Sequence, residues 1–168
     1  MVCDNPKAYA LKRAHQCKIP AVLVSPKLFQ SREAYEKVIA SILKSQDVDL
    51  VVLAGFMRIL TPYFIKAYRD KIVNIHPSYL PQFKGVHAIR DAFQARVKET
   101  GVTVHRVTNE LDSGPIILQK RVKILKNDTL ESLEKRIHAV EHKLYPLAIR
   151  QLIDKRCGGK KRVPFEGA

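Results

Sequence analysis

Residues 49–81 read DLVVLAGFMRILTPYFIKAYRDKIVNIHPSYLP, and this stretch sets the expected fold. It holds two short apolar runs, at 49–54 and 72–75, which are typical of strands buried on both faces of a parallel sheet. Between the runs, Thr61 is a suitable N-cap and Pro62 a suitable first residue for a helix. A strand, a helix and a second strand in this order predict an α/β protein.

The rest of the chain continues the alternation of helix and strand. Apolar residues recur at helical spacing from about residue 31 and again along 129–153, where Asp128 is the expected cap. The chain is expected to open directly on a helix, with no strand before it. We therefore expect helices at 5–16, from 31, at 61–69, 87–98 and 129–153, and strands at 21–24, 49–54, 72–75, 102–107 and 116–124.

Composition favours one compact domain of a soluble protein. The chain has 168 residues, of which 46% are apolar, and it has no run of about 18 apolar residues and no secretory signal pattern. We therefore expect a cytoplasmic protein that does not enter membranes. Cys3, Cys17 and Cys157 are odd in number and lack CxxC spacing, which argues against a disulfide framework and against a zinc site. No metal is expected.

The net charge of +14, from 30 Lys and Arg against 16 Asp and Glu, should attract anionic ligands. Nucleic acid, a phosphorylated metabolite and a polycarboxylate cofactor all fit this charge. We expect a domain over 1–153 and a solvated basic tail over 154–168, and we do not expect nucleic-acid binding through the tail. The tail carries the late basic cluster of Lys155, Arg156, Lys160, Lys161 and Arg162.

Three polar side chains could serve one acyl-transfer reaction. His76 is expected just past the end of a buried strand, where open α/β sheets bind ligands, and Pro77 holds its backbone extended. Asn74, two residues earlier in an extended segment, faces the same side. An amide N–H and an imidazole acid that meet at one carbonyl oxygen would stabilise an oxyanion. Asp112, in a turn between two strands, could reach the imidazole and accept the proton of an attacking amine.

Several motifs, taken in order, resemble the formyltransferase superfamily and within it most closely the phosphoribosylglycinamide formyltransferases. The resemblance runs from about residue 1 to about residue 153. A tRNA formyltransferase of the same superfamily would be expected to add a C-terminal nucleic-acid-binding domain, for which this chain has no room. The matching segments are VVLAGFMRIL (51–60), NIHPSYLP (74–81), GVTVHRV (101–107), NELDSGPIILQ (109–119) and EHKLYP (141–146).

The resemblance implies a Rossmann-like α/β fold, with a mostly parallel sheet flanked by helices. It also implies transfer of a formyl group from 10-formyltetrahydrofolate to the amine of 5'-phosphoribosylglycinamide, also called glycinamide ribonucleotide, in de novo purine (IMP) biosynthesis. The implied partners are these small molecules, and the chain would be a monomer or a homodimer. Hydrolysis of formyltetrahydrofolate is the alternative within the enzyme class. A truncated fragment that binds folate without turnover is the alternative outside it.

Residue by residue, the resemblance implies three kinds of role. Asn74 would bind the oxyanion and the folate, His76 would be the general acid, and Asp112 would fix the charge state of His76. The folate would also be held by Arg32 and by the segment Met57, Arg58, Ile59 and Leu60, and the glycinamide substrate by Glu141. His105, on the strand that leads to Asp112, would either line the pocket or pack beneath it.

One feature of the family has no match in this sequence. Family members begin with a strand and a glycine-rich loop that binds the substrate phosphate, whereas this chain contains neither GxGxxG nor GxxxxGK. The chain is therefore expected to lack the first strand and the phosphate loop. Either the start is missing or the phosphate is held by the surplus Lys and Arg side chains, and we expect the former.

Overall fold

The computed structural model describes residues 1–156, so Cys157 and the basic cluster from Lys160 onward lie outside the described residues. The chain divides into two compact units, each with its own contacts. The first unit comprises Met1–Val51 and Arg58–Lys71, and the second comprises Val52–Met57 and the chain from Ile72 onward. The prediction of one domain over 1–153 with a tail over 154–168 stays a prediction.

The first unit combines a small parallel sheet with helices. Val2–Cys3 pairs with Val22–Leu23, so the expectation that the chain opens on a helix is wrong. The first helix also begins at Tyr9 and not at residue 5, because the Asn5 side chain accepts a hydrogen bond from Lys7 N and stabilises a turn. The elements are β1 (Val2–Cys3), α1 (Tyr9–Gln16), β2 (Val22–Leu23), η1 (Pro26–Leu28), α2 (Arg32–Ser45) and α3 (Pro62–Ala67).

Helices α2 and α3 of this unit begin where the sequence predicted. Ser31 Oγ accepts a hydrogen bond from Ala34 N at the start of α2, and Thr61 caps α3 ahead of Pro62. The helices pack through buried aromatic and aliphatic side chains, and Tyr68 donates a hydrogen bond to Ala40 O. The core of the unit is formed by Tyr35, Ile39, Ala40, Phe64 and Tyr68.

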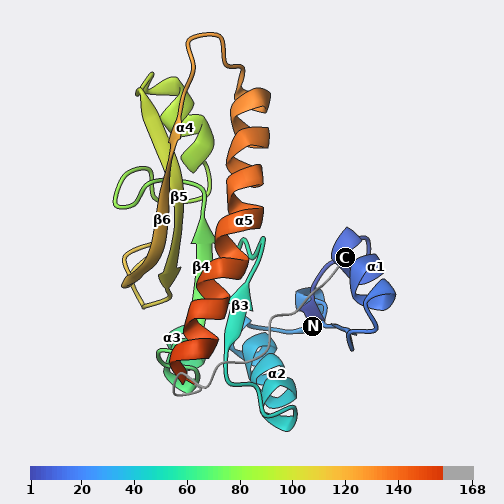
Figure 1. Ribbon diagram of the computed structural model, residues 1–168. Coiled ribbons are helices and arrows are strands. Elements are labelled where there is room, and N and C mark those ends of the chain that lie inside the picture. The colour runs from blue at the N-terminus through green and yellow to red at the C-terminus, as the bar shows by residue number, and fades with distance from the viewer. Residues whose placement is uncertain (157–168) are drawn as a thin grey trace. The chain divides into compact units, whose positions relative to one another are not determined.

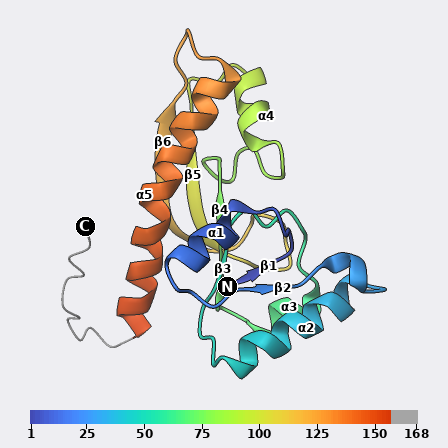
Figure 2. The same ribbon diagram turned by 90° about the vertical axis from the view of Figure 1, so that its right-hand side faces the viewer.

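The second unit is built on a sheet with the strand order β3-β4-β5-β6. The pairs β4–β5 and β5–β6 are antiparallel. The long helix α5 runs along one face of this sheet (Figures 1 and 2), so the predicted α/β class, with helices against the sheet, is confirmed. The elements are β3 (Val51–Leu53), β4 (Ile72–His76), α4 (Ala88–Gln94), β5 (Glu99–Arg106), β6 (Ile116–Lys123) and α5 (Leu130–Arg156).

A buried tyrosine fixes α5 to the sheet. The Tyr145 hydroxyl lies 2.6 Å from Leu53 O and 3.0 Å from Val73 O, so one side chain of α5 binds both β3 and β4. Burial strongly raises the pKa of this phenol, which therefore stays neutral and remains a hydrogen-bond donor. The apolar core around it consists of Ile72, Val73, Val102, Val104, Leu133, Ile137 and Ala148.

Two predictions about the strands are wrong. The run at 49–54 forms a strand of only three residues, and Val52 is 39% exposed, because β3 is the end strand of its sheet and not an interior one. His76 is the last residue of β4 and not a loop residue beyond it, because it pairs with Thr103 of the next strand.

The boundaries around α4 and α5 also differ from the prediction. Helix α4 ends at Gln94, since Arg96 has a positive φ of 51°, and β5 starts three residues early because Glu99 pairs with Lys123. Asp128 does not cap α5. Thr129 Oγ1 accepts the hydrogen bond from Ser132 N, whereas the Asp128 carboxylate binds both terminal nitrogens of Arg136.

Candidate functional site

The register of β4 and β5 gathers four polar side chains on one face of the sheet. Asn74 and His76 are two residues apart on β4 and therefore point to the same side. Directly opposite them on β5 are His105 and Thr103, and cross-strand partners share a face. The sequence predicted the first pair. The sequence left open whether His105 lines the site, and Thr103 follows only from the register, which the structure supplies.

Asp112 joins two of these side chains. It lies in the connection between β5 and β6 with a positive φ of 48°. Its Oδ2 atom is 3.4 Å from Nδ1 of His76, and its Oδ1 atom is 3.6 Å from Nε2 of His105. The side chains of these three residues are at most 7% exposed, so their mutual interactions are little screened by water. The predicted proximity of His76 and Asp112 is therefore present.

Both ring nitrogens of His76 face oxygen atoms. Nε2 lies 2.8 Å from Phe83 O, and because a carbonyl only accepts, Nε2 must carry a hydrogen in this contact. Nδ1 faces the Asp112 carboxylate, which also accepts a hydrogen bond from Gly85 N at 2.9 Å. The loop around Phe83 and Gly85 is thus bonded to both members of the pair. Sequence reasoning missed this loop, since its contacts use the backbone and not the side chains.

His105 uses one ring nitrogen in a hydrogen bond and leaves the other without a partner. Nδ1 lies 2.8 Å from Arg106 O and must donate to it, which leaves the lone pair on Nε2 facing Asp112. Nε2 is buried without a hydrogen-bond partner. Burial lowers the pKa of this imidazole, and nearby His76 lowers it further, although the Arg106 carbonyl and Asp112 oppose the shift. Because Nε2 faces Asp112, it can accept a hydrogen bond from that carboxyl group when Asp112 takes up a proton, which gives a function to a residue whose role the sequence left open.

A buried hydroxyl supports the segment that follows His76. Thr103 Oγ1 donates to Ser78 O at 2.7 Å and accepts hydrogen bonds from Leu80 N at 3.1 Å and from Gln119 Nε2 at 2.9 Å. The Gln119 amide also donates to Leu80 O. One donor and two acceptor positions are all a hydroxyl has, so Thr103 is fully used. The sequence signal, a Thr between two Val residues on a strand, is too common to single it out.

The Asn74 side chain is the open member of the group. Among residues 1–156, it makes no recorded side-chain hydrogen bond and it is partly exposed, so its amide is available to a ligand. Asn74 therefore supplies a free donor next to a buried acid–base pair.

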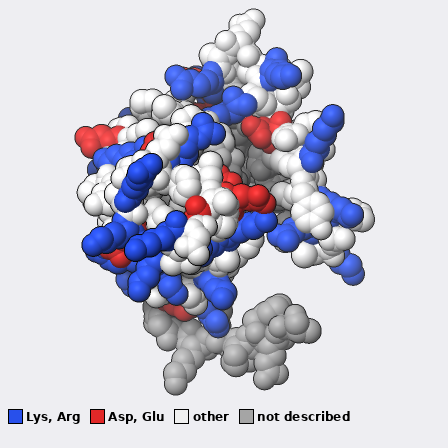
Figure 3. All heavy atoms as spheres, turned by 90° about the horizontal axis from the view of Figure 1, so that it is seen from above, with Lys and Arg blue, Asp and Glu red and all other residues white. Residues whose placement is uncertain are grey.

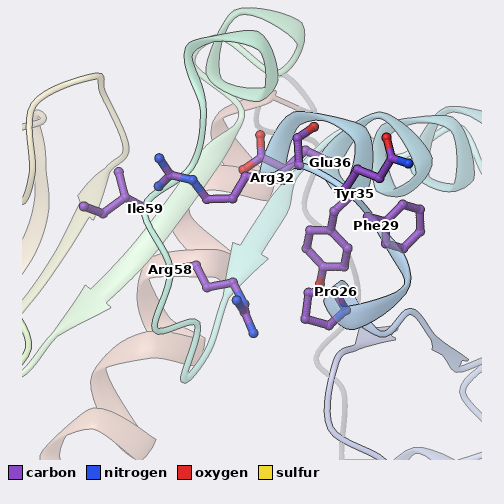
Figure 4. Close-up of a pocket in the computed structure, with 9 residues that line it drawn as sticks. Pro26, Phe29, Arg32, Tyr35, Glu36, Arg58 and Ile59 are labelled. Atoms are coloured by element: carbon purple, nitrogen blue, oxygen red, sulfur yellow. The ribbon is translucent and has the colours of Figure 1, made fainter.

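In the first unit, the predicted folate-binding residues only partly share a cavity. Arg32, Arg58 and Ile59 line it together with the carboxylate of Glu36 and the aromatic Tyr35 (Figure 4). The two guanidinium groups suit an anionic ligand, and the apolar side chains suit its carbon skeleton. The full lining comprises Pro26, Phe29, Gln30, Ser31, Arg32, Tyr35, Glu36, Arg58 and Ile59.

The remaining predicted residues lie apart from this lining. Leu60 is buried in the core, so only its backbone can meet a ligand, whereas Met57 is 76% exposed. Glu141 lies on α5 with Oε2 2.6 Å from Nδ1 of His138, so the structure pairs it with a neighbour on its own helix and not with Asn74, His76 or Asp112. The role predicted for Glu141 stays a prediction.

Other classes of site receive little support in the described part of the chain. Residues 1–156 contain no group of three or more His, Cys, Asp or Glu side chains that could hold a metal ion. None of their helices has both the length and the apolar character needed to cross a bilayer. Lys and Arg side chains are scattered among uncharged ones over the face seen in Figure 3, and no single basic stripe of the kind that tracks a nucleic acid stands out there.

Comparison with known proteins places these features in one family. The formyl transferase family matches residues 1–149. The chain is 45% identical over 161 residues to phosphoribosylglycinamide formyltransferase of Bacillus subtilis, which covers 96% of this chain and 83% of that protein. It is 43% identical over 154 residues to trifunctional purine biosynthetic protein adenosine-3 of Drosophila melanogaster, covering 92% of this chain and 11% of that protein. The crystal structure of phosphoribosylglycinamide formyltransferase from Streptococcus pneumoniae superposes with a TM-score of 0.88 at 42% identity, over 90% of this chain and 84% of that one.

Proposed function

Because the chain belongs to the formyl transferase family, we propose that it transfers a formyl group from 10-formyltetrahydrofolate to the amine of 5'-phosphoribosylglycinamide. Relatives that align with more than 90% of this chain carry the name of that enzyme or of a trifunctional purine biosynthetic protein. The family implies a folate-type formyl donor. The reaction would belong to de novo purine biosynthesis and to one-carbon metabolism.

The proposed chemistry is direct attack of the amine nitrogen on the formyl carbon. A C–N bond forms, and the carbonyl oxygen becomes an oxyanion. The Asn74 amide would stabilise it, together with the Nε2–H of His76 once that group exchanges Phe83 O for the oxyanion. Asp112 would take the proton that the amine loses, and the lone pair on His105 Nε2 would accept a hydrogen bond from the new carboxyl group. The oxyanion then collapses to the new amide carbonyl as the bond from the formyl carbon to the folate nitrogen breaks. His76, as general acid, would give that nitrogen a proton, and the proton taken up by Asp112 would restore His76.

One observation carries the proposal. A buried carboxylate has a different histidine on each of its oxygen atoms, at 3.4 Å and 3.6 Å, and the Asn74 amide lies two residues from His76 and directly opposite His105. A group of this composition can hold a negative charge and accept a proton at the same place. The donor residues Arg32, Met57, Arg58, Ile59 and Leu60 and the acceptor residue Glu141 enter the proposal through the family resemblance.

An assay with and without the amine tests the proposal. The chain is incubated with 10-formyltetrahydrofolate, and both released tetrahydrofolate and formylated glycinamide ribonucleotide are quantified. We expect both products in equal amounts, and neither when the amine is omitted or when His76 is replaced by Ala. Release of tetrahydrofolate at full rate without the amine would instead identify a hydrolase. Binding of the donor with no turnover would identify a folate-binding fragment.

A further inference from the structure

Glu36 is a buried carboxylate that the proposed chemistry does not use. The residue lies on α2 and is 2% exposed. All of its recorded hydrogen bonds go to Thr61, whose N–H lies 3.0 Å and 3.1 Å from the two carboxylate oxygens and whose hydroxyl binds the second of them. No Lys or Arg within residues 1–155 forms an ion pair with it. A buried charge is costly, so these hydrogen bonds must compensate for it.

The bond to Thr61 fixes the end of an otherwise open segment. Residues 54–60 connect β3 to α3, and within the described chain none of their backbone groups bonds to another backbone group. Met57 and Ile59 in this segment are exposed. Thr61 is where regular structure resumes, because its hydroxyl accepts from Phe64 N at the start of α3. Glu36 therefore holds the point from which the open backbone departs.

Glu36 also borders the cavity that this segment lines. Arg58 and Ile59 lie in the same lining as Glu36 (Figure 4), and Nε of Arg58 lies 3.3 Å from Oδ2 of Asp4. The carboxylate thus lies between the cavity and the anchor of the segment. A backbone whose free N–H and C=O groups are held in place binds a ligand without a further ordering cost.

We propose that Glu36 is a positioning residue, and that its carboxylate sets the affinity for the formyl donor by fixing the backbone of residues 58–60 through Thr61. This rests on the proposed function, because it takes the segment as part of the donor site. A purely structural role for Glu36 would lower stability and leave the affinity of the folded protein unchanged. A positioning role changes affinity for the donor and leaves the chemical step and acceptor binding unchanged.

The test is direct binding of 10-formyltetrahydrofolate by calorimetry, together with turnover at saturating donor, in Glu36→Gln and a matched control. Glutamine keeps the shape and one acceptor oxygen but turns an N–H toward the other Thr61 donor. We expect donor Kd to rise about tenfold, as for loss of one hydrogen bond to a charged group, with kcat and acceptor KM within about twofold. Glu33→Gln on the exposed face of the same helix, paired with Lys37, should bind as the wild type does.

Two further measurements keep the result interpretable. Amide hydrogen exchange in Glu36→Gln should accelerate in residues 54–61 and stay unchanged elsewhere on α2 and α3. Thr61→Ser, which retains both donors, should keep wild-type affinity. Unchanged donor Kd in folded Glu36→Gln overturns the positioning role and leaves the proposed function standing. Absence of donor binding by the wild-type chain overturns both.

Discussion

The surroundings of Asp112 and the segment at 54–60 are organised in opposite ways. Around Asp112, the two histidines are buried and the adjoining loop is bonded to the pair through Phe83 O and Gly85 N. Along 54–60, backbone groups are unpaired within the described chain and side chains such as Met57 are exposed. A proton-transfer group gains from a fixed, water-poor environment, whereas a binding segment needs unsatisfied groups to offer a ligand. The predictions below test this contrast.

The largest effect is expected from Asp112→Asn. The amide cannot take up a proton from the amine, so kcat should fall by about 10² to 10⁴-fold. Affinity for the formyl donor should stay nearly unchanged, because the proposed donor-binding segment at 54–60 does not include Asp112. Steady-state kinetics and direct donor binding measure the two quantities. An equal loss of both would contradict the separation of chemistry from donor binding.

Within the segment at 54–60, two neighbouring residues should have different effects, one on stability and the other on donor binding. Leu60 is 8% exposed, so Leu60→Ala should lower the free energy of unfolding by about 2 to 5 kcal/mol. Ile59 is 61% exposed, so Ile59→Ala should leave stability within about 0.5 kcal/mol and raise donor KM by a few-fold. Urea denaturation and donor kinetics check both. If Ile59→Ala unfolded the protein, the open character of this segment would be wrong.

The segment that follows His76 should keep its hydrogen bonds only when residue 103 carries a hydroxyl group. Thr103→Val removes the partner of Ser78 O, of Leu80 N and of one of the two N–H groups of the Gln119 amide, at a cost of about 1 to 3 kcal/mol for each buried group. We expect lower Tm and lower kcat, with donor KM unchanged. Thr103→Ser restores the three bonds and should recover most of the kcat. Failure of Ser to do better than Val would show that shape, and not the hydroxyl, matters here.

The smallest effect concerns pH. His105 has its pKa lowered from the ordinary value of 6.5, so the unfolded chain binds a proton more readily than the folded one. The stability that comes from burying the uncharged His105 is therefore fully present above pH 6.5, and it is lost as the pH falls from 6.5 through the lowered pKa. Thermal unfolding between pH 8 and 5 should show a shallower fall in Tm for His105→Gln than for the wild type. Parallel curves would exclude this linkage.

The sequence predicted the pattern of elements better than their edges. The helix starts near residue 31 and at Thr61 were predicted correctly, and in the structure Ser31 and Thr61 are caps that act through neighbours three residues away. The exposure of Val52 could not be foreseen, since it depends on which strand lies at the edge of the sheet. Asp128 was mistaken for a cap because its partner, Arg136, lies eight residues further along the chain, beyond the three-residue spacing of a cap, and the folded loop brings the two side chains together.

The same distinction applies to the site. The pairing of His76 with Asp112 was predicted because the two motifs each carry a chemically unusual residue in a plausible position. Thr103 and Phe83 were missed. A hydroxyl residue on a strand is too common to indicate a site, and a main-chain carbonyl is present at every residue. The roles of Asn74, His76, Asp112, Arg32, Met57, Arg58, Ile59, Leu60 and Glu141 stay predictions, as do cytoplasmic location and a monomeric or dimeric state.

Gly114, two residues after Asp112, limits what directed evolution can do with this loop. A Cβ atom there would come within 1.9 Å of Arg106 O, the carbonyl that holds the Nδ1 hydrogen of His105. Any larger residue would displace that carbonyl, and His105 would lose the hydrogen bond that keeps the hydrogen on Nδ1. A saturation library over residues 110–115 should therefore return glycine alone at 114 among active clones, while residues whose side chains face outward vary freely.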